Sequence, residues 1–204
     1  MKILVCISSV PDTTSKINFT ADKSAFDKNG IQWVINPLDE FALTKAVKLQ
    51  ETQGATVTLV TVGDAAVEAV MRKALAIGAN DAVRINTEPK DSLTVAKEIA
   101  KVAQEGGFDL ILCGKESLDY NGGAVPAMVA QLLNQPFVNA SVGLEINGSD
   151  ATVVREIEGG KETVSVKLPA VIAGQKGLVE EKDLIIPNMR GIMTARTKPL
   201  TVKE

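Results

Sequence analysis

Residues 153–178 read VVREIEGGKETVSVKLPAVIAGQKGL, and this stretch decides how the last third of the chain folds. Apolar and polar residues alternate over 153–158 and again over 163–168, as in strands with one buried face. Gly159 and Gly160 between them supply a turn that tolerates positive φ. Pro169 then leads into residues 170–173, which are all apolar. The stretch predicts a β-hairpin followed by a short buried strand.

Upstream of this hairpin, apolar strands alternate with amphipathic helices at the spacing typical of βαβ units. The strands are predicted at residues 3–7, 56–61, 82–85 and 109–113, and the helices start near residues 36, 65, 91 and 123. This order predicts an α/β fold: an open, mostly parallel, Rossmann-like sheet with helices on both faces. We expect a single domain, with an α/β core in residues 1–136 and an antiparallel appendage in residues 137–204.

Three local features refine this prediction. Residues 16–35 are expected to form a loop and a hairpin, with Asn29-Gly30 as its turn. Gly78 follows the second helix and predicts a left-handed cap. Leu93 falls on the apolar face of the third helix and is expected to be buried.

The composition excludes several classes of function. The chain has no histidine, which removes the commonest general base and the usual serine and cysteine triads. Its net charge is −3 and its pI is near 5.2, which argues against nucleic acid as a partner. No apolar run reaches the roughly 18 residues of a membrane span. The apolar N-terminal run is too short for a signal peptide, so we expect a cytoplasmic protein without membrane insertion.

The carboxyl ends of the strands are the expected place for a ligand, because open α/β sheets bind ligands where the strand order reverses. This rule selects residues 8–13, 62–64 and 114–123. It also makes Cys6 and Cys113 possible neighbours on adjacent strands. Two small core thiols are the favoured interpretation, and a redox role is the less favoured one.

Residues 114–123 (GKESLDYNGG) follow a predicted strand and open a helix. Glycines there allow a close backbone approach, and the helix start offers free N–H groups to an anion. The loop has neither the P-loop pattern nor the G-x-G-x-x-G dinucleotide pattern. On its residues alone, it predicts a phosphate cradle and a simple turn with a helix cap equally well.

The hairpin stretch resembles the signature of the electron transfer flavoprotein β subunit. The match runs Val153-x-Arg155-x-x-Glu158-Gly159-Gly160-Lys161-Glu162-x-Val164, four residues, then Pro169-x-Val171-Ile172-Ala173. Residues 3–12 are similar to the family's opening strand and loop. Residues 36–40 (NPLDE) are similar to its Asn-Pro-Phe-Asp-Glu segment, and residues 72–79 to one of its helix ends. The resemblance extends over nearly the whole chain.

The resemblance implies that the β subunit holds a structural AMP, while FAD is bound mainly by an α subunit. The positions it assigns to the nucleotide (AMP or FAD) are Cys6, Asn36, Pro37, Leu38, Asp39, Val62, Gly114, Lys115, Asp119, Asn121, Gly122, Gly123, Ala124 and Val125. Thr13 falls near the FAD of the α subunit, where the family often has tyrosine. Residues 124–126 read Ala-Val-Pro where the family has Gln-Thr-Gly. The amide and hydroxyl side chains expected near the phosphate are therefore missing, and backbone N–H groups of residues 122–124 are their substitutes.

A partner surface is implied by residues 183–199, which resemble the family's recognition loop. Ile185, Ile186, Pro187 and Met189 are the implied contacts with acyl-CoA or related dehydrogenases, with Ile186 as the anchor. Adjacent apolar residues in a polar loop suggest a covered surface, and burial within the chain itself explains them equally well. The family's usual C-terminal arm, which wraps the α subunit, is expected to be lacking, because the sequence ends at Glu204.

The leading hypothesis is an electron-carrier subunit without catalysis of its own. One alternative is the bifurcating type, with FAD in the β site. Another is a stand-alone adenine-nucleotide sensor of the universal-stress type, but its Gly-x-x-Gly, nine residues, Gly-Ser/Thr motif is missing after residue 113. An adenylating enzyme would need a Ser-Gly-Gly loop after the first strand, and Ser8-Ser9-Val10-Pro11 is not one.

Overall fold

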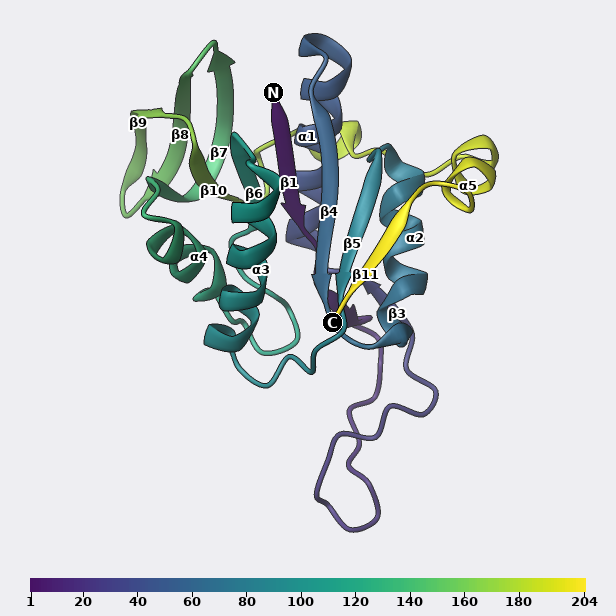
Figure 1. Ribbon diagram of the computed structural model, residues 1–204. Helices are drawn as coiled ribbons and strands as arrows, with labels where there is room; N and C mark the ends of the chain where they lie inside the picture. Colours follow the sequence, from purple (N-terminus) through teal and green to yellow (C-terminus); the bar gives the residue numbers. More distant parts are fainter.

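A nine-stranded sheet runs through the whole molecule, and the computed structural model describes residues 1–204 (Figure 1). The strands lie in the spatial order β11 (Leu200–Lys203), β5 (Asp81–Ile85), β4 (Thr56–Val62), β1 (Lys2–Cys6), β6 (Leu110–Gly114), β10 (Ala170–Gly174), β7 (Phe137–Asn147), β8 (Asp150–Ile157) and β9 (Gly160–Lys167). Neighbours from β11 to β7 are all parallel, and β8 is antiparallel to both β7 and β9. The predicted fold class, with antiparallel strands toward the C-terminus, is confirmed.

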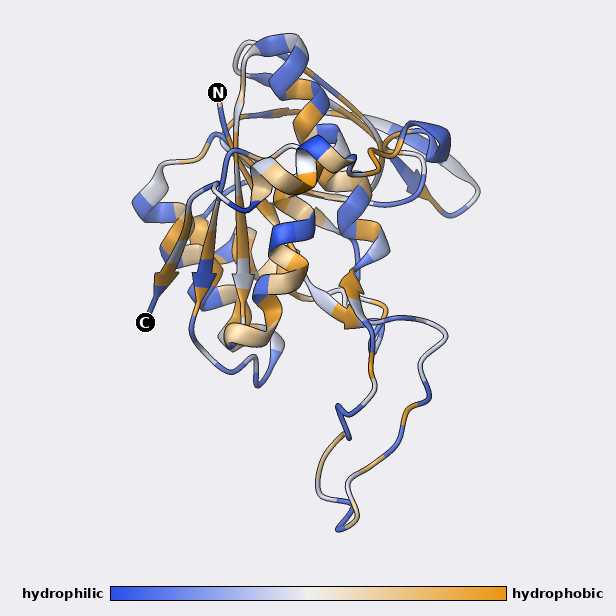
Figure 2. Cartoon of the chain, turned by 90° about the vertical axis from the view of Figure 1, so that its right-hand side faces the viewer, coloured by the Kyte–Doolittle hydropathy of each residue, from blue (hydrophilic) through white to orange (hydrophobic).

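Helices cover both faces of the sheet, because each carries one apolar side. The helices are α1 (Pro37–Gln53), α2 (Glu68–Ile77), α3 (Ser92–Gly106), α4 (Val125–Leu133) and α5 (Met189–Ala195), with 3-10 turns at η1 (Ala65–Val67) and η2 (Glu181–Asp183). The larger apolar cluster lies between the sheet and α1 and α2, and the smaller one lies under α3 and α4. Figure 2 shows the apolar residues gathered in the strands and on the helix sides that face them.

The predicted hairpin and buried strand form as β8, β9 and β10. Gly159 has φ 83° at the turn, so a residue with a side chain would be strained there. Strand β10 is buried along its whole length and lies between β6 and β7, parallel to both. The antiparallel strands β8 and β9 therefore extend the same sheet that residues 1–114 begin. Strand β10 joins this sheet beside β6, and β11 joins it beside β5.

The hairpin predicted within residues 16–35 is wrong in its pairing. A two-stranded sheet instead joins β2 (Ser9–Pro11) to β3 (Trp33–Ile35), and residues 12–32 form a long loop beyond the carboxyl edge of the main sheet (Figures 1 and 2). Within the loop only Phe19 and Phe26 form an isolated bridge. The outer pairing wins because Val10 and Ile35 are buried against the core, whereas residues 17 and 19 are exposed.

Two smaller expectations also fail. Gly78 ends α2 at φ 154° and ψ −11°, which is not the left-handed helical conformation. A Cβ at Gly78 would lie 2.8 Å from Cγ1 of Val47, so close packing of α1 accounts for the glycine. Leu93 is 45% exposed because it lies in the first turn of α3, beyond the edge of the core. No helix combines the length and apolar composition that crossing a bilayer requires.

Candidate functional site

A cavity of about 180 Å³ lies at the carboxyl ends of β1 and β6. These strands are neighbours in the sheet, but the chain reaches β6 only after building β4 and β5 on the other side of β1. The strand order therefore reverses here, as the sequence predicted for a ligand site. The cavity is lined by Cys6, Ile7, Ser8, Ser9, Asp39, Val60, Thr61, Val62, Pro89, Val95, Ile99, Cys113, Gly114, Glu116, Ser117, Asp119, Tyr120, Gly122, Val125 and Pro126.

Asp39 joins three segments around this cavity. Its Oδ2 accepts a hydrogen bond of 2.7 Å from the N–H of Ser8, and its Oδ1 accepts one of 2.9 Å from the N–H of Gly114. The residue is buried in the first turn of α1. Burial raises the pKa of Asp39 to about 6, against the opposing effect of hydrogen bonds from Ser8, Asn36 and Gly114. The carboxyl group therefore fixes the ends of β1 and β6 relative to α1.

Gly114 allows α1 to approach the end of β6. A Cβ on this residue would clash with the Asp39 carboxylate and would lie 2.9 Å from the Asp39 nitrogen. Real Cβ atoms essentially never come so close, so a larger residue would push the helix away. The glycine predicted at the nucleotide loop is thus required by the packing of the site itself.

Asn36 holds the next part of the loop. Its Nδ2 donates a 2.9 Å hydrogen bond to the carbonyl oxygen of Glu116, and its Oδ1 accepts one of 3.2 Å from the N–H of Leu118. The side chain is 1% exposed and does not line the cavity. Asn36 therefore holds residues 116–118 in place from outside the cavity lining.

The loop that follows closes on itself before α4 begins. The N–H of Ser117 donates to the carbonyl oxygen of Gly122 at 3.0 Å, and Asn121 takes φ 55°. Helix α4 has no side-chain cap at Ala124, and Pro126 has no N–H. The first turn of α4 therefore lacks a capping side chain, and Val125 of this turn lines the cavity, where a helix start favours an anion.

The structure places half of the predicted nucleotide residues on the cavity wall and the rest outside its lining. The residues on the wall are Cys6, Asp39, Val62, Gly114, Asp119, Gly122 and Val125. The residues outside the lining are Asn36, Pro37, Leu38, Lys115, Asn121, Gly123 and Ala124. Thr13 is exposed on the long loop of residues 12–32 and lines neither this cavity nor the next.

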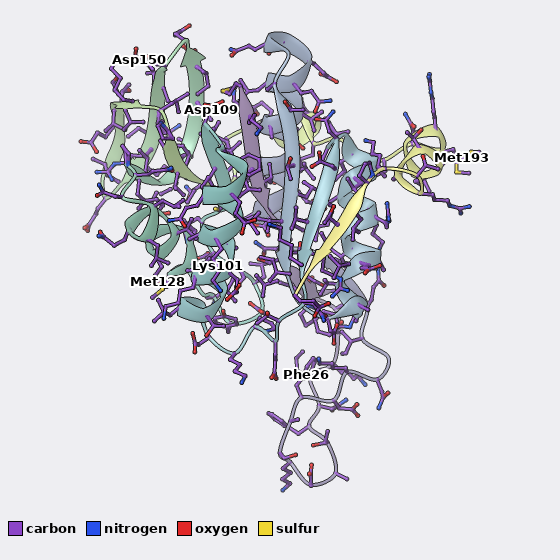
Figure 3. The ribbon with its side chains drawn as sticks, in the orientation of Figure 1. Phe26, Lys101, Asp109, Met128, Asp150 and Met193 are labelled. Carbon is purple, nitrogen blue, oxygen red and sulfur yellow. The ribbon has the colours of Figure 1, made fainter.

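A second cavity, of about 510 Å³, adjoins the first and shares Ser9, Val62, Pro89 and Asp119 with it. Residues 86–89, which follow β5, and Trp33 line it, and sequence reasoning missed both. The signal for residues 86–89 was present, since they too follow the carboxyl end of a predicted strand. The ring of Trp33 meets Phe26 edge to face with centroids 6.3 Å apart, and this contact links the long loop to the cavity wall. Figure 3 shows Phe26 beneath the carboxyl edge of the sheet.

The predicted partner residues differ in exposure. Ile186 is 86% exposed and Met189 is 73% exposed, whereas Ile185 packs partly against the core. Met193, on the same short helix, is also exposed and lies far from the β8–β9 hairpin (Figure 3). Ile186 is thus the apolar residue of this loop that the chain leaves uncovered.

Comparison with known proteins matches this sequence to one family. A family model described as "Electron transfer flavoprotein domain" matches residues 24–204. The electron transfer flavoprotein subunit beta of Bacillus subtilis (strain 168) is 37% identical over 208 residues, covering 100% of this chain and 79% of the relative. The subunits beta of Bradyrhizobium diazoefficiens and Homo sapiens are 35% and 32% identical, over 100% and 99% of this chain and 81% and 80% of their own lengths. The chain therefore belongs to the electron transfer flavoprotein β-subunit family.

Proposed function

We propose that this chain is the β subunit of a heterodimeric electron transfer flavoprotein that carries electrons from dehydrogenases to a downstream acceptor. The names of its relatives describe a subunit beta, and this naming supports the existence of a partner α subunit. In this proposal the α subunit holds the FAD, and FAD supplies the redox chemistry. The β chain supports that subunit, holds a structural AMP and presents a docking loop.

The proposal that the chain binds a nucleotide is supported by the residues that line the first cavity. Its floor is apolar, with Val60, Val95 and Ile99, which suits the flat face of a purine. Ser8, which follows β1, and Ser9, which begins β2, add polar groups suited to a sugar. The uncapped first turn of α4 suits a phosphate, because its N–H groups and helix dipole favour negative charge.

Lys115 and Asp119 contribute differently to this fit. Asp119 lines both cavities, whereas Lys115 lines neither, and the Lys115 N–H donates to the carbonyl oxygen of Gly174 at 2.8 Å. The cavity therefore offers backbone groups rather than a side-chain cation to a phosphate. We expect AMP to bind less tightly than it does where the Gln-Thr-Gly segment is present.

A role without catalysis is supported by how Asp39 is used. Asp39 lines the cavity and has a raised pKa, so it is a candidate for a general base. Both Asp39 oxygens accept backbone hydrogen bonds within the chain, one from Ser8 and one from Gly114. The carboxylate is thus committed to holding the loops together.

Docking of a dehydrogenase is proposed at Ile186. A nearly fully exposed isoleucine, bounded by Pro187, is the kind of apolar residue that fills a pocket on a partner. Exposed Met189 and Met193 lie on the helix that follows and extend the apolar surface with side chains that adapt to different partners.

The test is to co-express the chain with an α subunit, purify the complex, denature it, and count the released nucleotides. One FAD and one AMP per heterodimer is the expected result. Two FAD and no AMP would replace the simple carrier with a bifurcating type that has a reactive flavin in the β cleft. A complex that forms with one FAD but no second nucleotide would refute AMP binding and leave the carrier role intact. Failure to form a complex would refute the subunit role.

A further inference from the structure

The only two cysteines of the chain lie on adjacent strands, and both line the cavity proposed for the nucleotide. Strands β1 and β6 are parallel neighbours in which Val5 pairs with Leu112. Cys6 and Cys113 are the next residues along the two strands, and continuing this register sets them opposite one another. Both are free thiols. Neighbouring strands lie about 4.8 Å apart, within the Cα separation of about 4.4–6.8 Å that a disulfide spans.

Both thiols point to the same side of the sheet and open to the same space. They belong to the apolar cluster under α3 and α4, and both line the 180 Å³ cavity. Cys6 is 8% exposed and Cys113 is 4% exposed. A small reagent that enters the cleft therefore meets both sulfur atoms, whereas a nucleotide base in the cleft would cover them.

The two thiols also interact. A hydrogen bond with Cys6 raises the pKa of Cys113, and burial and the negative charges of Cys6 and Asp39 raise it further. Cys113 thus keeps its proton. This arrangement makes Cys6 the attacking thiol and Cys113 the one that completes a bond to it.

We propose that Cys6 and Cys113 form an oxidisable dithiol that a hydroperoxide entering the empty cleft converts to a disulfide, and that bound nucleotide shields. The shielding rests on the proposed function, because it needs the nucleotide in this cleft. The dithiol itself does not depend on that function.

The chemistry balances with hydrogen peroxide, the simplest hydroperoxide, as the oxidant. The thiolate sulfur of Cys6 attacks one peroxide oxygen, the O–O bond breaks, and hydroxide leaves and takes up a proton to become water. Cys6 is then a sulfenic acid. The sulfur of Cys113 attacks the Cys6 sulfur, the S–O bond breaks, and a second water leaves with the Cys113 proton. Two thiols are oxidised by two electrons in all, and one peroxide is reduced to two waters.

The first arm of the test uses the full 204-residue chain, reduced and free of nucleotide, with hydrogen peroxide. We expect both free thiols to disappear together, the intact mass to fall by two hydrogens, and a Cys6–Cys113 linked peptide that dithiothreitol releases. Cys6→Ser and Cys113→Ser variants provide the control, since neither can form the link. Oxygen addition at either cysteine without a linked peptide would overturn the dithiol.

The second arm repeats the oxidation with AMP at a hundred times the Kd measured by equilibrium dialysis. About one cleft in a hundred is then empty, so disulfide formation should slow by at least about ten-fold. AMP that binds without slowing the reaction would overturn the shielding. AMP that fails to bind, with the disulfide still forming, would refute the nucleotide part of the proposed function and leave the dithiol supported.

Discussion

Arg72, on α2, donates hydrogen bonds to carbonyl oxygens at and after the end of α5, and Lys198, which follows α5, donates to carbonyl oxygens at and after the end of α2. Nη1 of Arg72, on α2, donates to the carbonyl oxygens of Ala195 at 2.8 Å and Lys198 at 2.7 Å. Nζ of Lys198 donates in return to the carbonyl oxygens of Leu75 at 2.9 Å and Ala79 at 2.5 Å. Two cations thus cap two helix ends, where carbonyls lack partners and positive charge is favoured. This exchange fixes α5, which carries the proposed docking surface, against α2.

Replacing Lys198 by methionine should loosen α5. The change keeps the length of the side chain but leaves two partly buried carbonyls without their charged donor, which costs about 1–3 kcal/mol. We expect Tm to fall by roughly 3–10 °C for a domain of this size, and trypsin to cut sooner at Arg190 and Arg196. Lys73→Met, at an exposed position on α2, is the matched control. An equal loss of stability in the control would show that the cap is not the cause.

Gly114→Ala should damage the cleft itself. The added methyl clashes with Asp39, so α1 and the end of β6 must separate, at a cost of about 1–3 kcal/mol in the free energy of unfolding. Because the same contact shapes the cavity wall, AMP affinity should fall by about ten-fold. Urea unfolding and calorimetric titration measure the two effects. Gly160→Ala, where nothing lies within 4 Å of the new Cβ, should change neither.

The local elements were readable from the sequence because their causes are local. The alternation over residues 153–168 and the glycines of its turn produce β8 and β9, and the apolar run after Pro169 produces β10. The three loops that contribute to the cavity wall are predicted from the ends of the strands alone. The pairing of β2 with β3 is not, because it depends on which residues the core covers, and that is decided only after the sheet has formed.

The roles of Asn36 and Asp39 show a second limit. Both are predicted as nucleotide contacts, and in the structure their side chains also form hydrogen bonds to residues 116 and 114, which are 80 and 75 positions away in the chain. The hydrophobic periodicity of the sequence does not predict contacts between residues so far apart in the chain. The resemblance selected residues at and around the cavity, but only the geometry separates a residue that lines the cavity from one that supports it.

Ile186→Ser should affect docking alone. The side chain is 86% exposed, so its loss should change the free energy of unfolding by no more than about 0.5 kcal/mol. If it fills a pocket on a dehydrogenase, the rate of electron transfer from that enzyme at limiting concentration should fall by at least about ten-fold, as expected for a residue worth more than 1 kcal/mol at an interface. Ile157→Ser, at an exposed position on β8, is the control. Equal rates for both variants would remove Ile186 as the anchor.

Replacing Ala124-Val125-Pro126 by Gln-Thr-Gly should tighten AMP binding. The change restores an N–H at position 126 and adds a hydroxyl and an amide near the uncapped start of α4. Two new hydrogen bonds of about 1 kcal/mol each correspond to a gain of roughly 10–30-fold in affinity. Titration calorimetry with AMP measures it, and adenosine, which lacks the phosphate, is the control ligand. A similar gain for adenosine would place the effect away from the phosphate.

The stability of the fold should carry a signature of Asp39 between pH 4 and pH 7. The pKa of Asp39 is raised from 3.8 to about 6 in the folded protein, so the folded state binds the proton more tightly than the unfolded chain. The resulting stabilisation is fully present below pH 3.8 and is lost as the pH rises through 6. Other carboxyl groups, such as Asp91, have lowered pKa values and oppose this trend, so the total profile hides it.

Subtracting the profile of Asp39→Asn isolates the effect, because this variant keeps every other carboxyl group. The variant should be less stable at every pH, since an amide cannot accept both backbone hydrogen bonds without turning its NH2 toward one donor. The difference in unfolding free energy between wild type and variant should grow by about 1 kcal/mol from pH 7 to pH 5. Urea titrations at half-unit pH steps measure it. A difference that stays constant or shrinks toward acid would mean that Asp39 is ionised at little cost in its buried position.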